Sequence, residues 1–376
     1  MQFPVLPVMN PDFWVYKAEG FDSVILSFVG PEDSEFHGKV LRLYKNQEPQ
    51  FRRGNEPEIE DFTSRVILHQ NYIKNFIKPF LDYIDAGTPY AIAPEFVQAL
   101  SNKIQSNRPP RRINESHICT TSKVCLIHED HIPTQGISIE IKPKWGFLPD
   151  CPLIPSDSIK RRVSRFQLMQ RYKFKLGQIK SITSYDPLDL FSGERSSISK
   201  AITDITTNPQ SNLKVIRDGK TSELTPNERE TLVESLYTHD VLSKILKLQR
   251  LDKFDVECIV PILEKANSPT WEEMVNDENI INGICKMMNN EFVLPNDVEK
   301  VKELIENMSE SEARINIAAF LIAQAAKDCS VMISGQGNDV RFDVIDFDLK
   351  MPQHIISQYL KLDKKIIDAY KEMENK

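Results

Sequence analysis

Residues 313–348 read ARINIAAFLIAQAAKDCSVMISGQGNDVRFDVIDFD, and this stretch decides the fold more than any other part of the chain. Residues 313–326 are apolar on nearly every side of a helix, which predicts a buried helix. Two short apolar runs follow at 331–334 and 342–347, on either side of a glycine-containing turn at 335–339. This pattern predicts two antiparallel strands joined as a hairpin. A buried helix therefore leads directly into a hairpin.

The remaining sequence divides into a strand-rich first part and a mainly helical second part. Apolar runs and alternation predict strands at 24–29, 39–43, 123–127 and 137–141. A polar stretch at 46–61 predicts a loop. Helical spacing predicts a helix pair over 62–84, broken before Pro79, and further helices at 160–173, 194–206, 227–265 and 364–376. We therefore predict an α+β fold with two unequal lobes, a small N-terminal β-rich lobe (1–130) and a larger, mainly helical C-terminal lobe (131–376).

The composition is that of an ordinary soluble chain. Of 376 residues, 40% are hydrophobic and 27% charged, which excludes collagen, coiled coil and wholesale disorder. The 47 basic and 54 acidic residues give a net charge of −7, so any anion site must be local, and no nucleic-acid partner is indicated. No apolar stretch approaches the roughly 20 residues of a membrane helix, and the N-terminus lacks the pattern of a secretory signal. We expect a monomer of the nucleus or the cytoplasm.

Two acidic residues flank the predicted hairpin. Asp328 follows the buried helix, and Asp346 follows the second strand, with Asp348 two residues later. Phosphoryl transfer from ATP uses one carboxylate to orient the attacking hydroxyl and take its proton, and another to hold Mg²⁺ on the phosphates. A hairpin would bring Asp328 and Asp346 into one such site. The alternative is that both are turn and strand-end residues, because turns favour aspartate.

The segment E-I-K-P-K at 140–144 follows a predicted strand with two lysines. Alternation places Glu140 and Lys142 on one face of the strand. Pro143 stiffens the exit from the strand, so Lys144 can converge with Lys142. Two fixed ammonium groups suit a ligand with several phosphates. The alternative is a solvated strand end.

Other basic residues stand out against the acidic background, at 108–112, 165–175, 211–214 and 350. Nucleic acid is a rival ligand for such segments. However, no continuous basic helix and no aromatic stacking motif is present.

A turn near the N-terminus has features of a nucleotide site. Glu19, Gly20 and Ser23 lie in a turn between two predicted strands, and Arg42 lies on the next strand. A flexible turn over phosphates, with a cation from the neighbouring strand, is typical of a nucleotide-binding lobe. The sequence contains no G-x-x-x-x-G-K-[ST] motif, and an ordinary hairpin is the alternative.

Taken together, these segments resemble the inositol-pentakisphosphate 2-kinase family. The resemblance rests on E-I-K-P-K-W-G-F at 140–147, Y-D-P-L-D-L-F-S-G at 185–193 and A-K-D-C-S at 326–330. It also rests on I-D-F-D-L-K at 345–350, followed by L-D-K-K at 362–365, and on the segments at 19–24 and 38–42. These blocks occur in family order and span nearly the whole chain.

The resemblance implies a two-lobed kinase-like fold with inositol-phosphate-binding insertions, and transfer of a phosphoryl group from ATP, with Mg²⁺, to the 2-hydroxyl of inositol 1,3,4,5,6-pentakisphosphate. It implies that Asp328 activates this hydroxyl, and that Asp346, with Asp348 as a second candidate, holds Mg²⁺. The residues implied for ATP are Glu19, Gly20, Ser23 and Arg42 at the phosphates and Glu129, Asp130 and His131 at the adenine hinge. The residues implied for the substrate phosphates are Arg112, Lys142, Lys144, Lys173, Ser211, Asn212, Lys214, Lys350, His354 and Tyr359.

The sequence departs from the family pattern at several positions. Ser211 replaces the first Asn of an Asn-Asn pair, and His354 stands near a common Arg, which would make that contact depend on pH. Plant members carry a Cys/His zinc site, but Cys258 and Cys285 lack its spacing, so we predict no zinc and free thiols throughout. An alternative function is a non-catalytic pseudokinase module that binds inositol polyphosphates. A protein-kinase relative is a third hypothesis, although the H-R-D and D-F-G motifs are absent.

Overall fold

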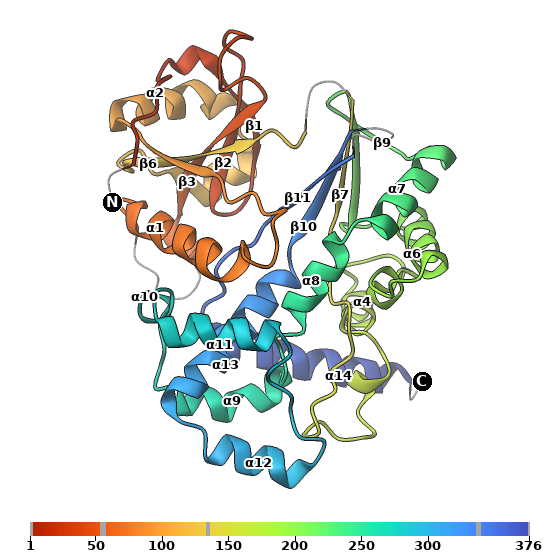
Figure 1. Ribbon diagram of the computed structural model, residues 1–376. Coiled ribbons are helices and arrows are strands. Elements are labelled where there is room, and N and C mark those ends of the chain that lie inside the picture. Colours follow the sequence, from red (N-terminus) through yellow and green to blue (C-terminus); the bar gives the residue numbers. More distant parts are fainter. Residues whose placement is uncertain (1–2, 53–57, 133–135, 336–339, 375–376) are drawn as a thin grey trace. The chain divides into compact units, whose positions relative to one another are not determined.

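The computed structural model describes residues 3–52, 58–132, 136–335 and 340–374. The chain forms two compact units (Figure 1). The first contains residues 1–70 and 85–133, and the second contains residues 71–84 and 134–376.

The first unit is built on an antiparallel sheet with the strand order β1-β2-β3-β6-β4, and β5 pairs with a further part of β3. Its strands are β1 (Trp14–Glu19), β2 (Ser23–Phe28), β3 (Lys39–Gln47), β4 (Thr88–Ala91), β5 (Ser116–Ile118) and β6 (Val124–Glu129). Its helices are α2 (Pro94–Ile104), α3 (Pro110–Glu115) and most of α1 (Thr63–Tyr72).

Helix α2 closes the main core of the first unit. Proline at its first turn fits a helix start, because the missing N–H has no partner there anyway. Its apolar side chains, spaced three and four apart, are Phe96, Val97, Leu100 and Ile104. They share a buried cluster with Trp14, Leu26 and Leu41 from the sheet. Burial of this stripe supplies most of the stability of the helix.

The second unit contains an antiparallel sheet with the strand order β11-β10-β7-β8-β9. Its strands are β7 (Ile137–Ile141), β8 (Leu213–Arg217), β9 (Lys220–Ser222), β10 (Ser330–Ser334) and β11 (Arg341–Ile345). Strand β10 lies between β7 and β11, with Val331 opposite Ile141 and Ser330 opposite Ile345.

Helices make up the rest of the second unit. They are α4 (Arg165–Lys175), α5 (Pro187–Leu190), α6 (Arg195–Thr207), α7 (Pro226–Thr238), α8 (Val241–Gln249), α9 (Asp255–Lys265), α10 (Trp271–Met274), α11 (Glu278–Met288), α12 (Val298–Glu306), α13 (Glu310–Ala326) and α14 (Lys361–Glu374). Helix α13 packs against α8, α9 and α11 and is buried over most of its length. A capping box between Ser309 and Glu312 fixes its start. Within the described part of the chain, no helix is long and apolar enough to cross a membrane.

Residues 71–84 belong to the second unit, and three contacts show why. The rings of Tyr72 and Phe76 lie 5.1 and 5.9 Å from that of Trp271. Asn75 Nδ2 donates to the Val275 carbonyl at 2.8 Å. The predicted helix pair over 62–84 is wrong: α1 continues into a single π-helical turn (Ile73–Ile77), and residues 80–84 form no second helix.

The mixed helix and strand content agrees with the predicted α+β class. The predicted buried helix and hairpin are confirmed as α13, β10 and β11, although residues 336–339 of the predicted turn lie outside the described residues. Strand β3 extends to Gln47, into the predicted loop at 46–61, because its last residues pair with β5. Strands β8 and β9 and helix α2 were not predicted.

Candidate active site

One end of the sheet in the second unit collects segments that are far apart in the sequence. Strands β7 and β11 end there, and strands β8 and β10 begin there, because neighbouring strands are antiparallel. The residues next to three of these strand ends are Lys142, Asp346 and Asn212, and Asp328 lies two residues before β10. The register of the sheet therefore brings together the late carboxylates and the E-I-K-P-K segment.

Asp328 lies between two lysines. Its Oδ2 is 3.0 Å from Lys350 Nζ, and its Oδ1 is 3.6 Å from Lys144 Nζ. The Asp328 side chain is 52% exposed, whereas those of Lys350 and Lys144 are 21% and 26% exposed. Part of the carboxylate is therefore accessible to a substrate, while the two ammonium groups are largely shielded.

A second cluster contains Glu140, Lys142, Ser330 and Asp346. Lys142 Nζ lies 3.2 Å from Asp346 Oδ2 and 3.5 Å from Glu140 Oε1. Ser330 Oγ is 3.0 Å from both Glu140 Oε1 and Asp346 Oδ2. Because a hydroxyl has one proton, Ser330 can donate to only one carboxylate at a time. The lysines that follow Glu140 thus lie on the same surface as the two aspartates, as the sequence predicted.

Two residues of this surface have left-handed backbone conformations. Lys144 has a φ of 65° and Asp346 a φ of 63°. Such conformations are uncommon for residues with a Cβ and persist only where the surroundings hold them. Asp346 directly follows β11, and Lys144 follows the rigid Pro143. The backbone conformation therefore sets the direction of both side chains.

The charges on this surface shift each other's ionisation. Desolvation alone would raise the pKa of Asp328, but the positive charges of Lys350 and Lys144 outweigh it and hold the pKa below its usual range. Desolvation would lower the pKa of Lys142, yet the attraction of Asp346 and Glu140 raises it. The pKa of Lys144 is lowered, mainly by desolvation. Asp328 opposes this effect only in part, and repulsion from Lys142 and Lys173 adds to it.

The pKa of Lys350 is raised. Its desolvation acts in the opposite direction, but Asp328 outweighs it, and Tyr359 and Asp348 add to the effect. Asp328, Lys142 and Lys350 therefore carry their charges at neutral pH.

The donor set in the second cluster fits a magnesium ion. Mg²⁺ usually takes one or two carboxylates and fills its other positions with phosphate oxygens and water. Glu140 and Asp346 supply carboxylate oxygens on either side of the Ser330 hydroxyl, and the ammonium of Lys142 already lies close to both. Among the described residues, no three histidine, cysteine, aspartate or glutamate side chains form a metal site on their own. A metal here would therefore need further oxygens from water or from phosphate groups.

The other predicted substrate residues of the second unit differ in their surroundings. Asn212 is buried, and its Nδ2 donates to the Lys142 carbonyl at 3.0 Å. Lys214 is exposed on β8, opposite Glu140 on β7, and Ser211 is exposed beside it. Lys173 is half-buried on α4. His354 and Tyr359 are half-buried before and within the π-helical segment Ile355–Leu360, and Asp348 is exposed.

In the first unit, Glu19 is a buried carboxylate held by two cations. Its side chain is 1% exposed and lies 2.8 Å from Lys45 Nζ and 3.1 Å from Arg108 Nη2. Lys45 Nζ also donates to the Gly20 carbonyl at 2.8 Å. These contacts hold the turn between β1 and β2 against buried side chains of the first unit.

Arg42 lies beside this turn. Its Nε donates to Ser23 Oγ at 3.1 Å, and its guanidinium lies 5.8 Å from the centre of the Tyr44 ring. Arg42, predicted to lie on the strand after this turn, lies on β3 and contacts Ser23 at the start of β2.

The three predicted hinge residues, Glu129, Asp130 and His131, have side-chain partners in the first unit. Glu129 pairs with Lys39, and Asp130 pairs with Lys17. His131 Nε2 lies 2.9 Å from Asp85 Oδ2, and His128 Nδ1 lies 3.3 Å from Asp85 Oδ1. The Asp130 N–H also donates to the Gly38 carbonyl at 2.8 Å, so contact between this segment and a base stays a prediction.

Arg112 is also part of the first unit. Its Nη1 lies 3.2 Å from Glu115 Oε2, and its carbonyl accepts from Arg108 Nη2 at 3.3 Å. Contact between Arg112 and a substrate phosphate stays a prediction.

Sequence reasoning did not include two residues that the geometry places in the candidate site. Ser330 is the last residue of the A-K-D-C-S block, and Glu140 is the first residue of E-I-K-P-K. Both motifs were recognised, but neither residue was assigned to the site. The opposition of Glu140 to Met332, two positions from Ser330, depends on the pairing of β7 with β10.

Comparison with known proteins agrees with these features. Residues 16–365 match the family model described as inositol-pentakisphosphate 2-kinase. A protein named inositol-pentakisphosphate 2-kinase from Arabidopsis thaliana is 28% identical, over 97% of this chain and 95% of the relative. Proteins of the same name from Danio rerio and Cryptococcus neoformans are 25% and 29% identical, over 97% and 95% of this chain and 94% and 93% of the relatives.

Proposed function

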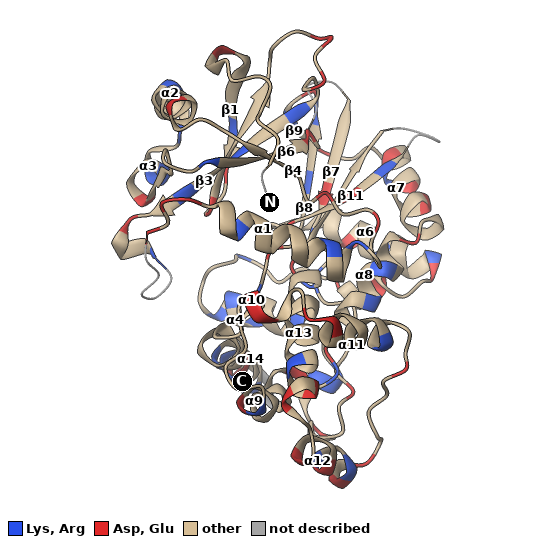
Figure 2. Cartoon of the chain, turned by 60° about the vertical axis from the view of Figure 1, so that its left-hand side comes forward, with Lys and Arg blue, Asp and Glu red and all other residues tan. Residues whose placement is uncertain are grey.

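Because the chain belongs to the inositol-pentakisphosphate 2-kinase family, we propose that it transfers the γ-phosphoryl group of ATP to the 2-hydroxyl of inositol 1,3,4,5,6-pentakisphosphate, giving inositol hexakisphosphate. The observation that carries this proposal is the convergence of Lys142, Lys144 and Lys350 on Asp346 and Asp328. Acidic and basic residues are otherwise interspersed along the strands and helices (Figure 2), so this local arrangement matters more than the net charge of −7.

The lysines would hold the phosphates of the substrate. Charge-assisted hydrogen bonds contribute about 1.5–3 kcal/mol each, so a few fixed ammonium groups can select a ring with many phosphates. Lys142 and Lys144 are set by the strand, by Pro143 and by the left-handed conformation of Lys144. Lys173, Lys214, Ser211, His354, Tyr359 and Arg112 are proposed as further phosphate contacts, and Asn212 acts at least through the Lys142 carbonyl.

Asp328 would orient the acceptor hydroxyl. Its depressed pKa makes it a weak base in the free protein, but phosphoryl transfer needs positioning more than proton abstraction. Phosphates that draw Lys144 and Lys350 away would leave Asp328 with less compensation, which raises its basicity as the hydroxyl arrives. Asp328 would thus accept a hydrogen bond from the hydroxyl when the substrate binds, and accept its proton during phosphoryl transfer.

Glu140 and Asp346, with Asp348 as a further candidate, would hold Mg²⁺, which neutralises charge on the β- and γ-phosphates of ATP. The turn around Gly20 with Arg42 would contact the phosphates of ATP, and residues 129–131 would contact its base. We further propose that the two units correspond to the lobes of a kinase-like fold and that the protein acts as a monomer in the nucleus or cytoplasm.

The test is incubation of the purified chain with Mg-ATP and inositol 1,3,4,5,6-pentakisphosphate, followed by separation of the products. Formation of inositol hexakisphosphate with matching loss of ATP is the expected result. Binding of the pentakisphosphate without any product would contradict the proposal and favour a non-catalytic binding module.

A further inference from the structure

The segment that carries Lys142 and Lys144 is held by three buried side chains. The carbonyls of Lys142, Pro143 and Lys144 accept hydrogen bonds from Asn212 Nδ2 at 3.0 Å, Tyr185 Oη at 2.8 Å and Gln249 Nε2 at 2.7 Å, respectively. Asn212 is 5% exposed, and Tyr185 and Gln249 are fully buried. Three consecutive carbonyls are thus fixed by side chains from three separate parts of the second unit.

Gln249 makes more contacts than the other two. It is the last residue of α8, and its Oε1 accepts from the Gly146 N–H at 2.8 Å. Its Nε2 also donates to the Ala326 carbonyl at 3.2 Å. One amide therefore bonds to the segment on both sides of Trp145 and to the last turn of α13, two residues before Asp328.

A second contact joins the same two segments. Lys327 is buried and pairs with Asp252, and its Nζ lies 3.8 Å from the centre of the Trp145 ring and 5.2 Å from that of Phe147. Lys327 precedes Asp328, and Trp145 follows Lys144. The segments that carry the candidate catalytic carboxylate and a candidate phosphate-binding lysine are therefore also joined by a buried side-chain contact.

We infer that Gln249 is a positioning residue that sets the separation between Lys144 and Asp328, an inference that rests on the proposed function. Gln249 is bonded to the Lys144 carbonyl and, through Ala326, to the turn that presents Asp328. The 3.6 Å distance between Lys144 Nζ and Asp328 Oδ1 depends on both backbones. Gln249 would consequently fix the distance between a substrate phosphate bound to Lys144 and an acceptor hydroxyl bound to Asp328.

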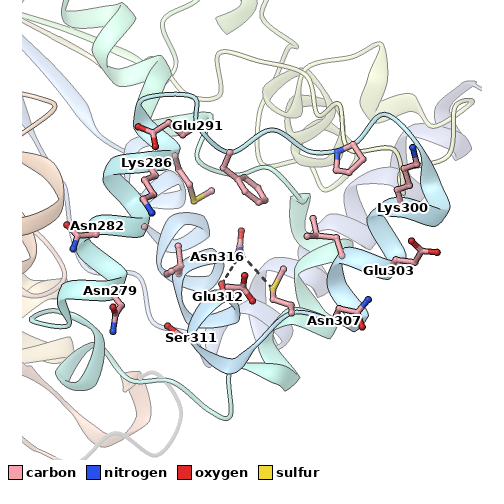
Figure 3. Close-up of a pocket in the computed structure, with 17 residues that line it drawn as sticks. Asn279, Asn282, Lys286, Glu291, Lys300, Glu303, Asn307, Ser311, Glu312 and Asn316 are labelled. Atoms are coloured by element: carbon pink, nitrogen blue, oxygen red, sulfur yellow. Dashed lines mark hydrogen bonds between the residues drawn. The ribbon is translucent and has the colours of Figure 1, made fainter.

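The test compares variants of similar size. Gln249→Met keeps the volume but removes all three hydrogen bonds, and Gln249→Asn keeps the amide on a side chain shorter by one methylene. Asn316→Leu is the matched control: this buried amide lies on α13, beside a hollow between α11, α12 and α13 (Figure 3), and bonds to the Glu312 carbonyl and Met308 Sδ. Neither of these hydrogen bonds involves the segment at 142–147.

Steady-state kinetics with both substrates give the main readout. Because small displacements of reacting groups can cost about 100-fold in rate, we expect kcat to fall between 10- and 100-fold in the Gln249 variants, with the KM for ATP nearly unchanged. The Asn316→Leu variant should keep its kcat even if its melting temperature falls. Tyr185→Phe, which frees only the Pro143 carbonyl, should raise the KM for the pentakisphosphate more than it lowers kcat.

Amide hydrogen exchange gives a readout that does not depend on turnover. Loss of the Gln249 acceptor should speed exchange in a peptide containing Gly146, but not in peptides from α11 or α12. Unchanged exchange there, or a Gln249 variant that is less stable yet turns over normally, would overturn the inference. If the unmodified protein forms no inositol hexakisphosphate, the proposed function fails instead. Accelerated exchange at Gly146 would still support a role for Gln249 in holding the segment at 144–146.

Discussion

Asp328→Asn separates the chemical role of this carboxylate from its electrostatic one. Asparagine keeps the shape but removes the charge that is needed to accept a proton, so we expect transfer to fall at least 100-fold. The same change releases Lys350 and Lys144, which lie 3.0 and 3.6 Å from the carboxylate. Both ammonium groups can then pair with the substrate phosphates without competition from a carboxylate. We therefore expect the inactive variant to bind the pentakisphosphate more tightly than the unmodified protein.

The magnitude follows from the two distances. In water, a pair at 3.0 Å is worth about 1.4 kcal/mol and one at 3.6 Å about 1.2 kcal/mol. Asp328 is half exposed, and exposed pairs usually contribute about 1 kcal/mol or less, so these values are upper bounds. A net gain of about 1 kcal/mol corresponds to a roughly fivefold lower Kd, and it should shrink as salt is added.

Isothermal titration with the pentakisphosphate measures the affinity, and single-turnover transfer from labelled ATP measures the chemistry. Asp368→Asn, at an exposed position on α14, changes the net charge equally and should alter neither. Transfer within tenfold of the unmodified protein, or weaker binding of the pentakisphosphate, would refute the reasoning about Asp328.

Three further changes test other parts of the structure. Lys142→Ala should raise the KM for the pentakisphosphate about tenfold or more and change the KM for ATP less; an ATP-selective defect in steady-state kinetics would place Lys142 at the nucleotide instead. Glu19→Gln should lower the free energy of unfolding by about 3 kcal/mol, because it leaves Lys45 and Arg108 buried without their carboxylate; a urea-unfolding midpoint equal to that of the unmodified protein would contradict this. The hydrogen bond from Arg217 lowers the pKa of Glu228 to about 2, so its ionised form stabilises the start of α7 above pH 4.5, and this contribution is lost as the pH falls toward 2. Glu228→Gln removes the ion pair with Arg217 and should therefore cost about 1 kcal/mol at pH 7 and much less near pH 2, whereas an equal cost in urea unfolding at both pH values would count against the assignment.

Local sequence patterns predicted several elements of this fold correctly. Alternation at 137–141 and the apolar runs after Asp328 predicted β7, β10 and β11, because each strand has one or two buried faces. Strand β8 was missed because Leu213 and Lys214 are half-buried and exposed, so its apolar signal is only two residues long. The entry of residues 71–84 into the second unit depends on Trp271, which lies nearly 200 positions further on.

The candidate site was predictable in its residue types but not in its supports. Motifs indicated Lys142, Lys144, Asp328 and Asp346, but the left-handed conformations of Lys144 and Asp346 leave no pattern in the sequence. Gln249 ends an amphipathic helix, where a polar residue is expected to face water. Only the tertiary structure shows that it is fully buried and bonded to three backbone groups.

The order of strands in the second sheet has a consequence for how the protein is made. Glu140 and Ser330 are 190 positions apart, yet their strands are neighbours. While a ribosome synthesises the helices from α7 to α13, β8 can already pair with β7 but the other edge of β7 has no partner, and such an edge can pair with other chains. We therefore expect nascent or truncated chains that stop before β10 to depend on chaperones, and catalytic competence to appear only after the C-terminal part has been released.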